Sequence, residues 1–65
     1  MKKIKVKKVD TFRDGGTAVY TDKNSIRYYV DHRIDTKTDG IVFDRYPDDL
    51  EAQQLKVKLE IVKDF

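Results

Sequence analysis

The fold is decided by residues 16–34, which continue after Gly16 as Thr17-Ala18-Val19-Tyr20-Thr21, then Asp22-Lys23-Asn24-Ser25, then Ile26-Arg27-Tyr28-Tyr29-Val30-Asp31-His32-Arg33-Ile34. Two runs rich in β-branched and aromatic residues flank a polar turn, which is a strong signal for a β-hairpin. It is also the one place where aromatic and basic residues collect on a surface. The sequence therefore predicts a hairpin here, with the rest of the chain built around it.

The register of this hairpin follows from the length of its turn. A two-residue loop at Lys23-Asn24 and a four-residue loop over residues 22–25 give the same pairing, with Thr21 opposite Ile26 and Val19 opposite Tyr28. Because side chains alternate across a strand, the face expected in the core carries Thr17, Val19, Thr21, Ile26, Tyr28, Val30 and Ile34. The opposite face is expected to carry Ala18, Tyr20, Arg27, Tyr29, Asp31 and Arg33.

Alternation also predicts a strand on the N-terminal side of the hairpin. Residues 3–9 alternate, with Ile4 and Val6 on one face, and the phase slips between Val6 and Val9, which indicates a bulge or the end of the strand. The lysines are typical of an edge strand guarded against pairing with other chains. Residues 14–16, Asp-Gly-Gly, predict a turn into the hairpin.

Three further elements are expected after the hairpin. Residues 41–43 predict a short fourth strand antiparallel to the third, which ends before Pro47. Residues 48–55 favour a short helix, since Asp48 and Glu51 have capping-box spacing, and its Leu50 and Leu55 would pack inward. Residues 55–61 alternate cleanly between aliphatic and charged side chains, which predicts a fifth strand.

This order of elements predicts a single small β domain over residues 1–65. The order resembles the SH3-like barrels, and the resemblance implies a five-stranded antiparallel barrel or rolled sheet with one short helix before the last strand. The chain has no Ala-Leu-Tyr-Asp-Tyr run and no Trp, so the Pro-rich peptide groove of true SH3 domains is not implied. A flat five-stranded sheet with one helix across it is the competing architecture.

The composition of the chain bears on its cellular compartment and on the cofactors and metals that it could bind. The net charge is +2 with a pI near 8.9, and 38% of residues are apolar against 40% charged. The absence of Cys favours a reducing compartment, and a single His leaves no multi-His metal site. There is no signal-peptide apolar region after Lys2-Lys3 and no membrane-length apolar run. We expect a cytoplasmic protein without cofactor, metal or membrane partner.

Catalytic and metal-binding motifs are weak. Asp31 and Arg33 share one strand face while His32 points to the other, so they make no preset catalytic group. The sequence Asp35-x-Lys37-x-Asp39-Gly40 resembles the front of an EF-hand loop, but Lys37 occupies a ligand position and Tyr46 stands where the loop needs Glu. We therefore expect no enzyme.

Function is sought instead on two surfaces. Tyr20, Arg27, Tyr29 and Arg33 would form a partner-binding face, because Tyr and Arg are enriched at interfaces. This favours a non-enzymatic protein-interaction domain, a self-associating accessory or inhibitory factor with a homodimer or another protein as partner. In composition the chain resembles small Lys- and Ile-rich proteins of bacteria and phages. The alternative is nucleic-acid binding by that face and by the basic first strand, with phosphate contacts from Lys3, Lys5 and Lys7.

Overall fold

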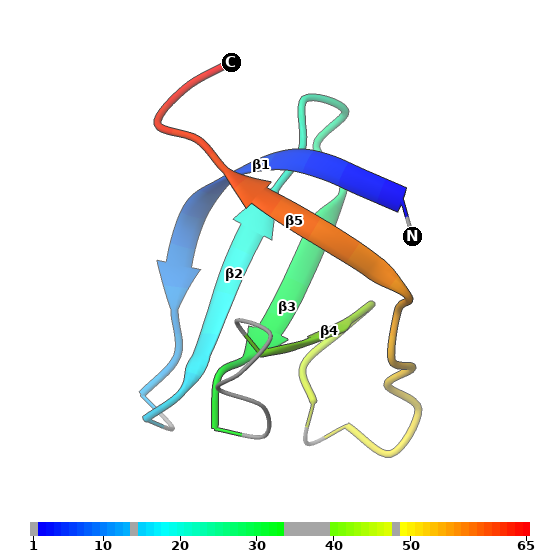
Figure 1. Ribbon diagram of the computed structural model, residues 1–65. Coiled ribbons are helices and arrows are strands. Elements are labelled where there is room, and N and C mark those ends of the chain that lie inside the picture. The colour runs from blue at the N-terminus through cyan, green and yellow to red at the C-terminus, as the bar shows by residue number, and fades with distance from the viewer. Residues whose placement is uncertain (1, 14, 34–39, 48) are drawn as a thin grey trace.

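The computed structural model describes residues 2–13, 15–33, 40–47 and 49–65. The chain forms five strands, which are β1 (Lys2–Thr11), β2 (Thr17–Thr21), β3 (Arg27–Asp31), β4 (Ile41–Phe43) and β5 (Val57–Ile61). They pair in the order β4-β3-β2-β1-β5 as one sheet that curls into a half-barrel (Figure 1). The prediction of a small all-β domain with strands in these five places is confirmed.

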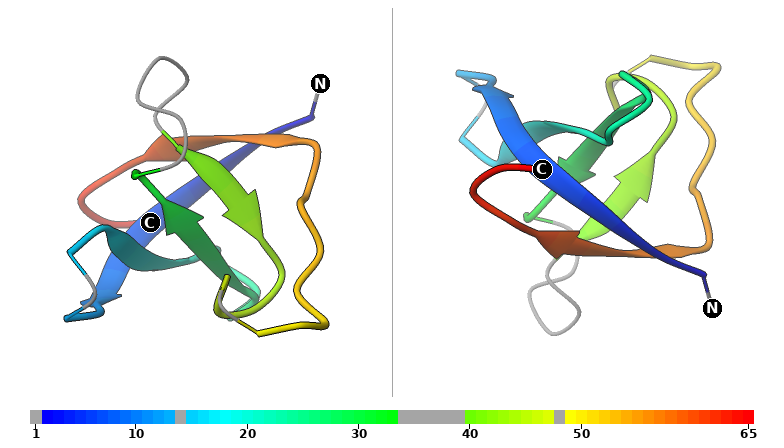
Figure 2. Two further views of the ribbon diagram at one scale, coloured as in Figure 1. Left: turned by 90° about the horizontal axis from the view of Figure 1, so that it is seen from below. Right: turned by 90° about the horizontal axis from the view of Figure 1, so that it is seen from above.

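The long first strand, β1, pairs with two different strands along its length. Its N-terminal half runs parallel to β5, from Lys2 opposite Val57 to Val6 opposite Ile61. Its C-terminal half is antiparallel to β2 from Lys7 onward, with a shift of register between Lys8 and Asp10. This bulge lies at Val9, at the end of the interval from Val6 to Val9 where the sequence predicts a slip of phase, and such a bulge bends a strand. The prediction that β1 is an edge strand is wrong for the strand as a whole, because β1 lies between β2 and β5 (Figure 2), although β2 runs along it only from Lys7 onward.

The sheet is mixed, so the prediction of an all-antiparallel sheet is wrong. The cause is the path of the chain after β4. Residues 53–55 run along β4, where the N–H of Asp44 donates to the carbonyl of Gln53 at 3.2 Å and the N–H of Leu55 donates to the carbonyl of Val42 at 2.7 Å. The chain then crosses from the β4 edge of the sheet to the β1 edge and enters β5 in the same direction as β1.

The helix expected over residues 48–55 is not formed by the described part of that segment; Asp48 itself lies outside the described residues. The N–H of Asp49 donates to Tyr46 and that of Ala52 to Asp49, which makes successive turns. Pairing of residues 53–55 with β4 takes the chain out of the helical path, so tertiary contacts override a weak local preference. Leu50 is fully exposed, against expectation, whereas Leu55 packs against the core as expected.

The half-buried side chain of Asp44 holds this turn segment to the end of β4. The Oδ1 atom of Asp44 accepts the N–H of Gln53 at 3.0 Å. That hydrogen bond lowers the pKa of Asp44 below its ordinary value; desolvation of the carboxyl opposes the shift, and the neighbouring Arg45 adds to it.

The hairpin register is shifted by one residue from the predicted one. Ala18 lies opposite Val30 and Tyr20 lies opposite Tyr28. Tyr28 and Val30 face the core as expected, but β2 is turned over, so Thr17 and Val19 are buried as expected but on the opposite face of the sheet. The sheet face lining the core, called here the inner face, therefore carries Ala18, Tyr20, Tyr28, Val30 and Val42. Ile26 is exposed instead of buried, and Ile34 lies outside the described residues.

The core is small and lies against this inner face. Val6 from β1 is fully buried beside the inner-face residues. Four partly buried side chains, Ile4, Leu55, Val57 and Leu59, complete it from the side of β1 and β5. The hairpin thus supplies most of the core, and the paired ends of the chain close over it.

Candidate functional site: a groove beside the hairpin tip

The hairpin loop has three residues, Lys23-Asn24-Ser25, and Asp22 organises it. The N–H of Asp22 donates to the carbonyl of Ile26 at 3.1 Å, and the N–H of Ser25 donates to the carbonyl of Asp22 at 3.1 Å. The Oδ1 atom of Asp22 accepts the N–H groups of Asn24 at 2.8 Å and Ile26 at 3.0 Å. Ser25 has φ of 66°, the left-handed conformation that closes three-residue hairpin loops.

The same aspartate binds a buried tyrosine. The hydroxyl of Tyr28 donates to Oδ2 of Asp22 at 3.1 Å, and both side chains are buried. Desolvation of the phenol raises the pKa of Tyr28, and the hydrogen bond and charge of Asp22 raise it further. Tyr28 therefore stays protonated and ties the loop to the sheet beneath it.

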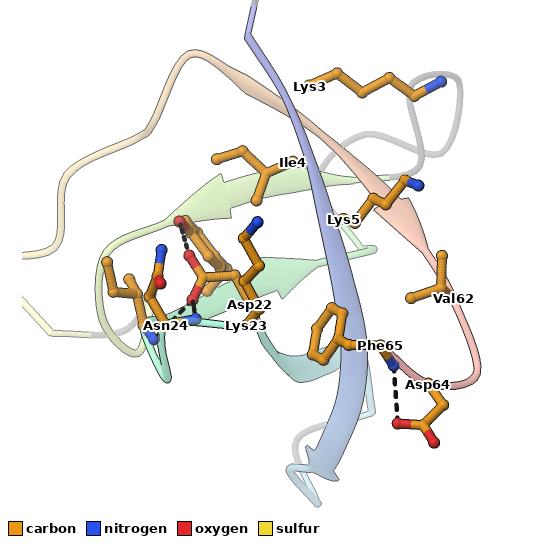
Figure 3. A pocket seen from close by; sticks show the side chains of 11 residues that line it. Lys3, Ile4, Lys5, Asp22, Lys23, Asn24, Val62, Asp64 and Phe65 are labelled. Atoms are coloured by element: carbon orange, nitrogen blue, oxygen red, sulfur yellow. Dashed lines mark hydrogen bonds between the residues drawn. The ribbon is translucent and has the colours of Figure 1, made fainter.

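A groove of about 640 Å³ lies between this loop, β1 and the last residues of the chain (Figure 3). Its walls hold two half-exposed apolar side chains, Ile26 at 53% and Phe65 at 51% exposure. Figure 3 shows Lys3 and Lys5 projecting from β1 on the side opposite to Ile4. The full lining consists of Lys3, Ile4, Lys5, Asp22, Lys23, Asn24, Ile26, Tyr28, Val62, Asp64 and Phe65.

Backbone groups of β1 also border the groove. Among the described residues, β2 pairs with β1 only from Lys7 onward, since the chain turns away after Thr21. The N–H of Val62 donates to the carbonyl of Val6 at 2.8 Å, so the N–H and C=O of Val6 point toward β5. These directions alternate along a strand. The N–H and C=O groups of Lys3 and Lys5 therefore point away from β5, to the groove side.

The four predicted partner-binding residues do not share one face. Tyr20 is buried in the core, because the three-residue loop puts it on the inner face. Arg27 and Tyr29 lie on the opposite, outer face, where the Tyr29 ring stacks at 6.1 Å on Phe12, which in turn meets Tyr46 edge-on at 4.6 Å. A role of Arg27 and Tyr29 in binding a partner stays a prediction.

Arg33 is committed to an ion pair within the fold. Asp31 is only 2% exposed, and its carboxylate accepts Arg33 Nε at 2.9 Å and Nη2 at 2.7 Å as well as the backbone N–H of Arg33 at 2.9 Å. Such a bidentate ion pair compensates the cost of burying the charge of Asp31. Arg33 thus has a structural task that the sequence reading did not foresee, and its guanidinium remains partly exposed.

The three lysines expected to contact phosphate lie along β1. Lys3 and Lys5 are exposed at the groove, and Lys7 is half-buried with its Nζ 5.6 Å from the centre of the Phe65 ring. Phe65 therefore contacts the side chain of Lys7 and also lines the groove, a position that the sequence did not suggest.

The remaining sequence expectations concern metal binding, a membrane span and His32. No group of three or more His, Asp or Glu side chains there is arranged to hold a metal ion. No helix there is long and apolar enough to cross a membrane. His32 is half-buried, and its neighbour Asp31 is taken by Arg33. Residues 35–39 of the EF-hand-like loop lie outside the described residues.

Comparison with known proteins adds no assignment: no protein-family model matches the chain, and neither curated proteins nor solved structures give a significant match. Sequence reasoning missed the groove because its walls come from the hairpin loop, β1 and the chain end together. The sequence did contain a signal for the shape of the loop. An Asp at position 22 can accept the backbone N–H of Asn24 and so stabilise the turn that forms one wall of the groove.

Proposed function

We propose that this chain is a non-enzymatic, cytoplasmic protein-interaction domain, an accessory or inhibitory factor of bacterial or phage type, that binds an extended segment of a partner protein in the groove. The observation that carries the proposal is the stretch of β1 backbone at Lys3 and Lys5, which borders a groove containing two half-exposed apolar side chains. An extended segment can add to such an edge through main-chain hydrogen bonds.

The chemistry of the groove favours an acidic segment with apolar residues at alternate positions. Lys3, Lys5 and Lys23 line it and outnumber the carboxylates of Asp22 and Asp64. Asp22 is already engaged by Tyr28 and by the loop N–H groups. Alternate side chains of a bound strand point to the same side, so one row would meet Ile26 and Phe65 while the other met the lysines.

A short synthetic peptide that alternates glutamate and valine is the probe for this proposal. We expect it to shift the amide resonances of Lys3, Lys5 and Ile26 in an NMR titration, and we expect its lysine-for-glutamate counterpart not to bind. Ile26→Ser should weaken binding about tenfold, since it removes the burial of one aliphatic side chain. Val9→Ser is the matched control, because Val9 is 47% exposed but does not line the groove.

The backbone contribution can be tested separately. Lys5→Pro removes both the charge and the groove-side N–H, whereas Lys5→Ala removes the charge alone. We expect the proline variant to bind the probe several-fold more weakly than the alanine variant. Equal binding of the two variants, or no binding of the probe to the unaltered protein, would refute strand addition in the groove.

A second candidate function, nucleic-acid binding, is favoured by the lysines of β1 together with Phe65. Lys3 and Lys5 are exposed on one side of the strand, and an exposed aromatic ring beside them could stack on a base. Fluorescence anisotropy with single-stranded DNA and RNA at low salt is the test. Binding that weakens steeply with salt and is lost in Lys3→Gln/Lys5→Gln would support it. Absence of binding at low salt would end it.

We also propose that the five strands have an SH3-like arrangement. The strand order β4-β3-β2-β1-β5 supports an SH3-like arrangement, and the parallel pairing of β5 with β1 departs from the antiparallel barrel that the sequence predicted.

A further inference from the structure

The last strand, β5, has one edge along which no described strand runs. It stands at the end of the strand order, and β1 lies along its other edge (Figures 1 and 2). An open strand edge offers unpaired backbone groups to any chain that can align with it. Which chain can pair there is determined by the backbone groups that point outward and by the side chains between them.

The outward groups of β5 belong to its odd-numbered residues. Val62 donates its N–H to Val6, which lies opposite Ile61, so Val62 points its N–H toward β1. Because these directions alternate along a strand, Val57, Leu59 and Ile61 point their N–H and C=O groups to the open edge. The side chains of Lys58 and Glu60 lie between them on the opposite sheet face.

We propose that β5 pairs antiparallel with β5 of a second copy of this chain, about a two-fold axis that passes beside Leu59. Leu59 then lies opposite Leu59 of the second copy, and Val57 lies opposite Ile61. Each of these pairs exchanges two main-chain hydrogen bonds, since all of these residues point their backbone groups outward. Lys58 lies directly opposite Glu60 of the second copy, and Glu60 opposite Lys58, in the closer, non-hydrogen-bonded positions.

Charge selects this register over its neighbours. A two-fold axis at Lys58 would oppose two lysines at its centre and would pair only Val57 to Leu59 within β5, with the favourable contact of Lys56 and Glu60 lying beyond the start of the strand. An axis at Glu60 would oppose two glutamates. An axis at Val57 would set Lys56 against Lys58. An axis at Ile61 would need residues beyond the end of the strand. Like charges directly opposite each other destabilise a strand pair, and opposite charges stabilise it, so the axis at Leu59 is favoured.

Apolar exposure points to the same pairing. Ile61 is 57% exposed, and Val57 and Leu59 are only half-buried where they pack at the margin of the core. In the proposed dimer Ile61 is covered by Val57 of the second copy. The dimer therefore covers apolar surface that one copy leaves open, and it uses none of the groove-lining residues.

Charge reversal tests the pairing and its register together. Lys58→Glu places two glutamates opposite each other at both ends of the interface, and Glu60→Lys does the same with lysines. We expect each variant to raise the dimer dissociation constant at least about tenfold, measured by sedimentation equilibrium, with circular dichroism to verify the fold. An equimolar mixture of the two variants should form a heterodimer as tight as the original homodimer, because each glutamate then meets a lysine.

The double variant Lys58→Glu/Glu60→Lys provides an independent check, since it exchanges both charges and should dimerise like the unaltered protein. Recovery in the mixture and in the double variant supports the proposal. A protein that stays monomeric at millimolar concentration overturns it. So do single variants that dimerise normally, or a mixture that fails to recover the affinity. These outcomes are independent of peptide binding in the groove.

Discussion

Asp31 shows how a single residue can determine the roles of its neighbours. Its carboxylate is nearly inaccessible to water, and Arg33 compensates it with two side-chain nitrogens. Gly16 lies directly under the arginine stem: a Cβ built there would collide with Cγ of Arg33 and lie 2.7 Å from Cδ. The ion pair therefore depends on the absence of a side chain at position 16.

Gly16→Ala should destabilise the protein by about 1–3 kcal/mol, because the displaced guanidinium leaves a buried carboxylate poorly paired. Urea denaturation measures the change. In an Arg33→Ala background the same substitution should cost under about 0.5 kcal/mol, since nothing then occupies the space. An equal cost in both backgrounds would show that Arg33 does not explain the glycine.

Tyr28 gives a prediction about pH. Its pKa is raised above the ordinary value of 10.0 in the folded state, so the unfolded chain loses the phenol proton first. The resulting stabilisation is fully present below about pH 10 and is lost as pH rises through the folded-state pKa. Removing the hydroxyl also breaks the bond to buried Asp22, so Tyr28→Phe should cost about 1–2 kcal/mol at neutral pH.

We therefore expect the stability of the unaltered protein to fall more steeply above about pH 10 than that of Tyr28→Phe. Urea denaturation at a series of alkaline pH values measures both slopes. Tyr29→Phe is the control, because it leaves the Tyr28–Asp22 pair intact. Parallel pH profiles for Tyr28→Phe and the unaltered protein would contradict the assignment.

Among the elements, the hairpin loop has the largest consequence, since its length sets which face of β2 lines the core cluster. Ser25 holds a left-handed conformation that suits glycine better. Ser25→Gly should raise the free energy of unfolding by roughly 0.5 kcal/mol, as relief of strain exceeds the entropy of the added glycine. Ser25→Val should lower it. Chemical denaturation decides, and a stabilising valine would exclude the loop geometry described above.

The positions of the strands could be predicted from the sequence, but the length of this loop could not. Alternation located all five strands and the irregularity near Val9, because period-two patterns reflect burial directly. Alternation could not give the number of residues in the hairpin loop. Asp22 is the last paired residue before the loop, and its side chain also accepts the N–H groups of the loop, so it reads equally well as a strand or a loop residue. One residue of error turned β2 over and moved Tyr20 from the proposed surface into the core.

The sequence also could not reveal the candidate groove or the direction of β5. Both depend on where the chain runs after β4, and the pairing of residues 53–55 with β4 settled that path against a local preference for helix. Ile26 and Phe65 are far apart in sequence and become neighbours of one groove only when β1 and β5 pair.

For the molecule as a whole, closure of the core depends on a pairing between the two ends of the chain. Val6 is fully buried, and Val57 and Leu59 of β5 pack against the core cluster to which it belongs. Burial of aliphatic side chains contributes about 1.5–3 kcal/mol each at most, and a domain of 65 residues has only a few kcal/mol of net stability. The contribution of β5 is therefore comparable to the stability of the entire fold.

A chain that ends after Lys56 should consequently fail to fold, although it keeps β1 to β4 and the whole hairpin. A chain that ends after Val62 keeps β5 and the hydrogen bond from Val62 to Val6, and it should retain a cooperative thermal transition. Circular dichroism melts and the dispersion of amide resonances compare the two. A cooperative transition in the shorter chain would mean that the hairpin and β4 form a core of their own, and the parallel pair would then be an addition to the fold instead of its closure.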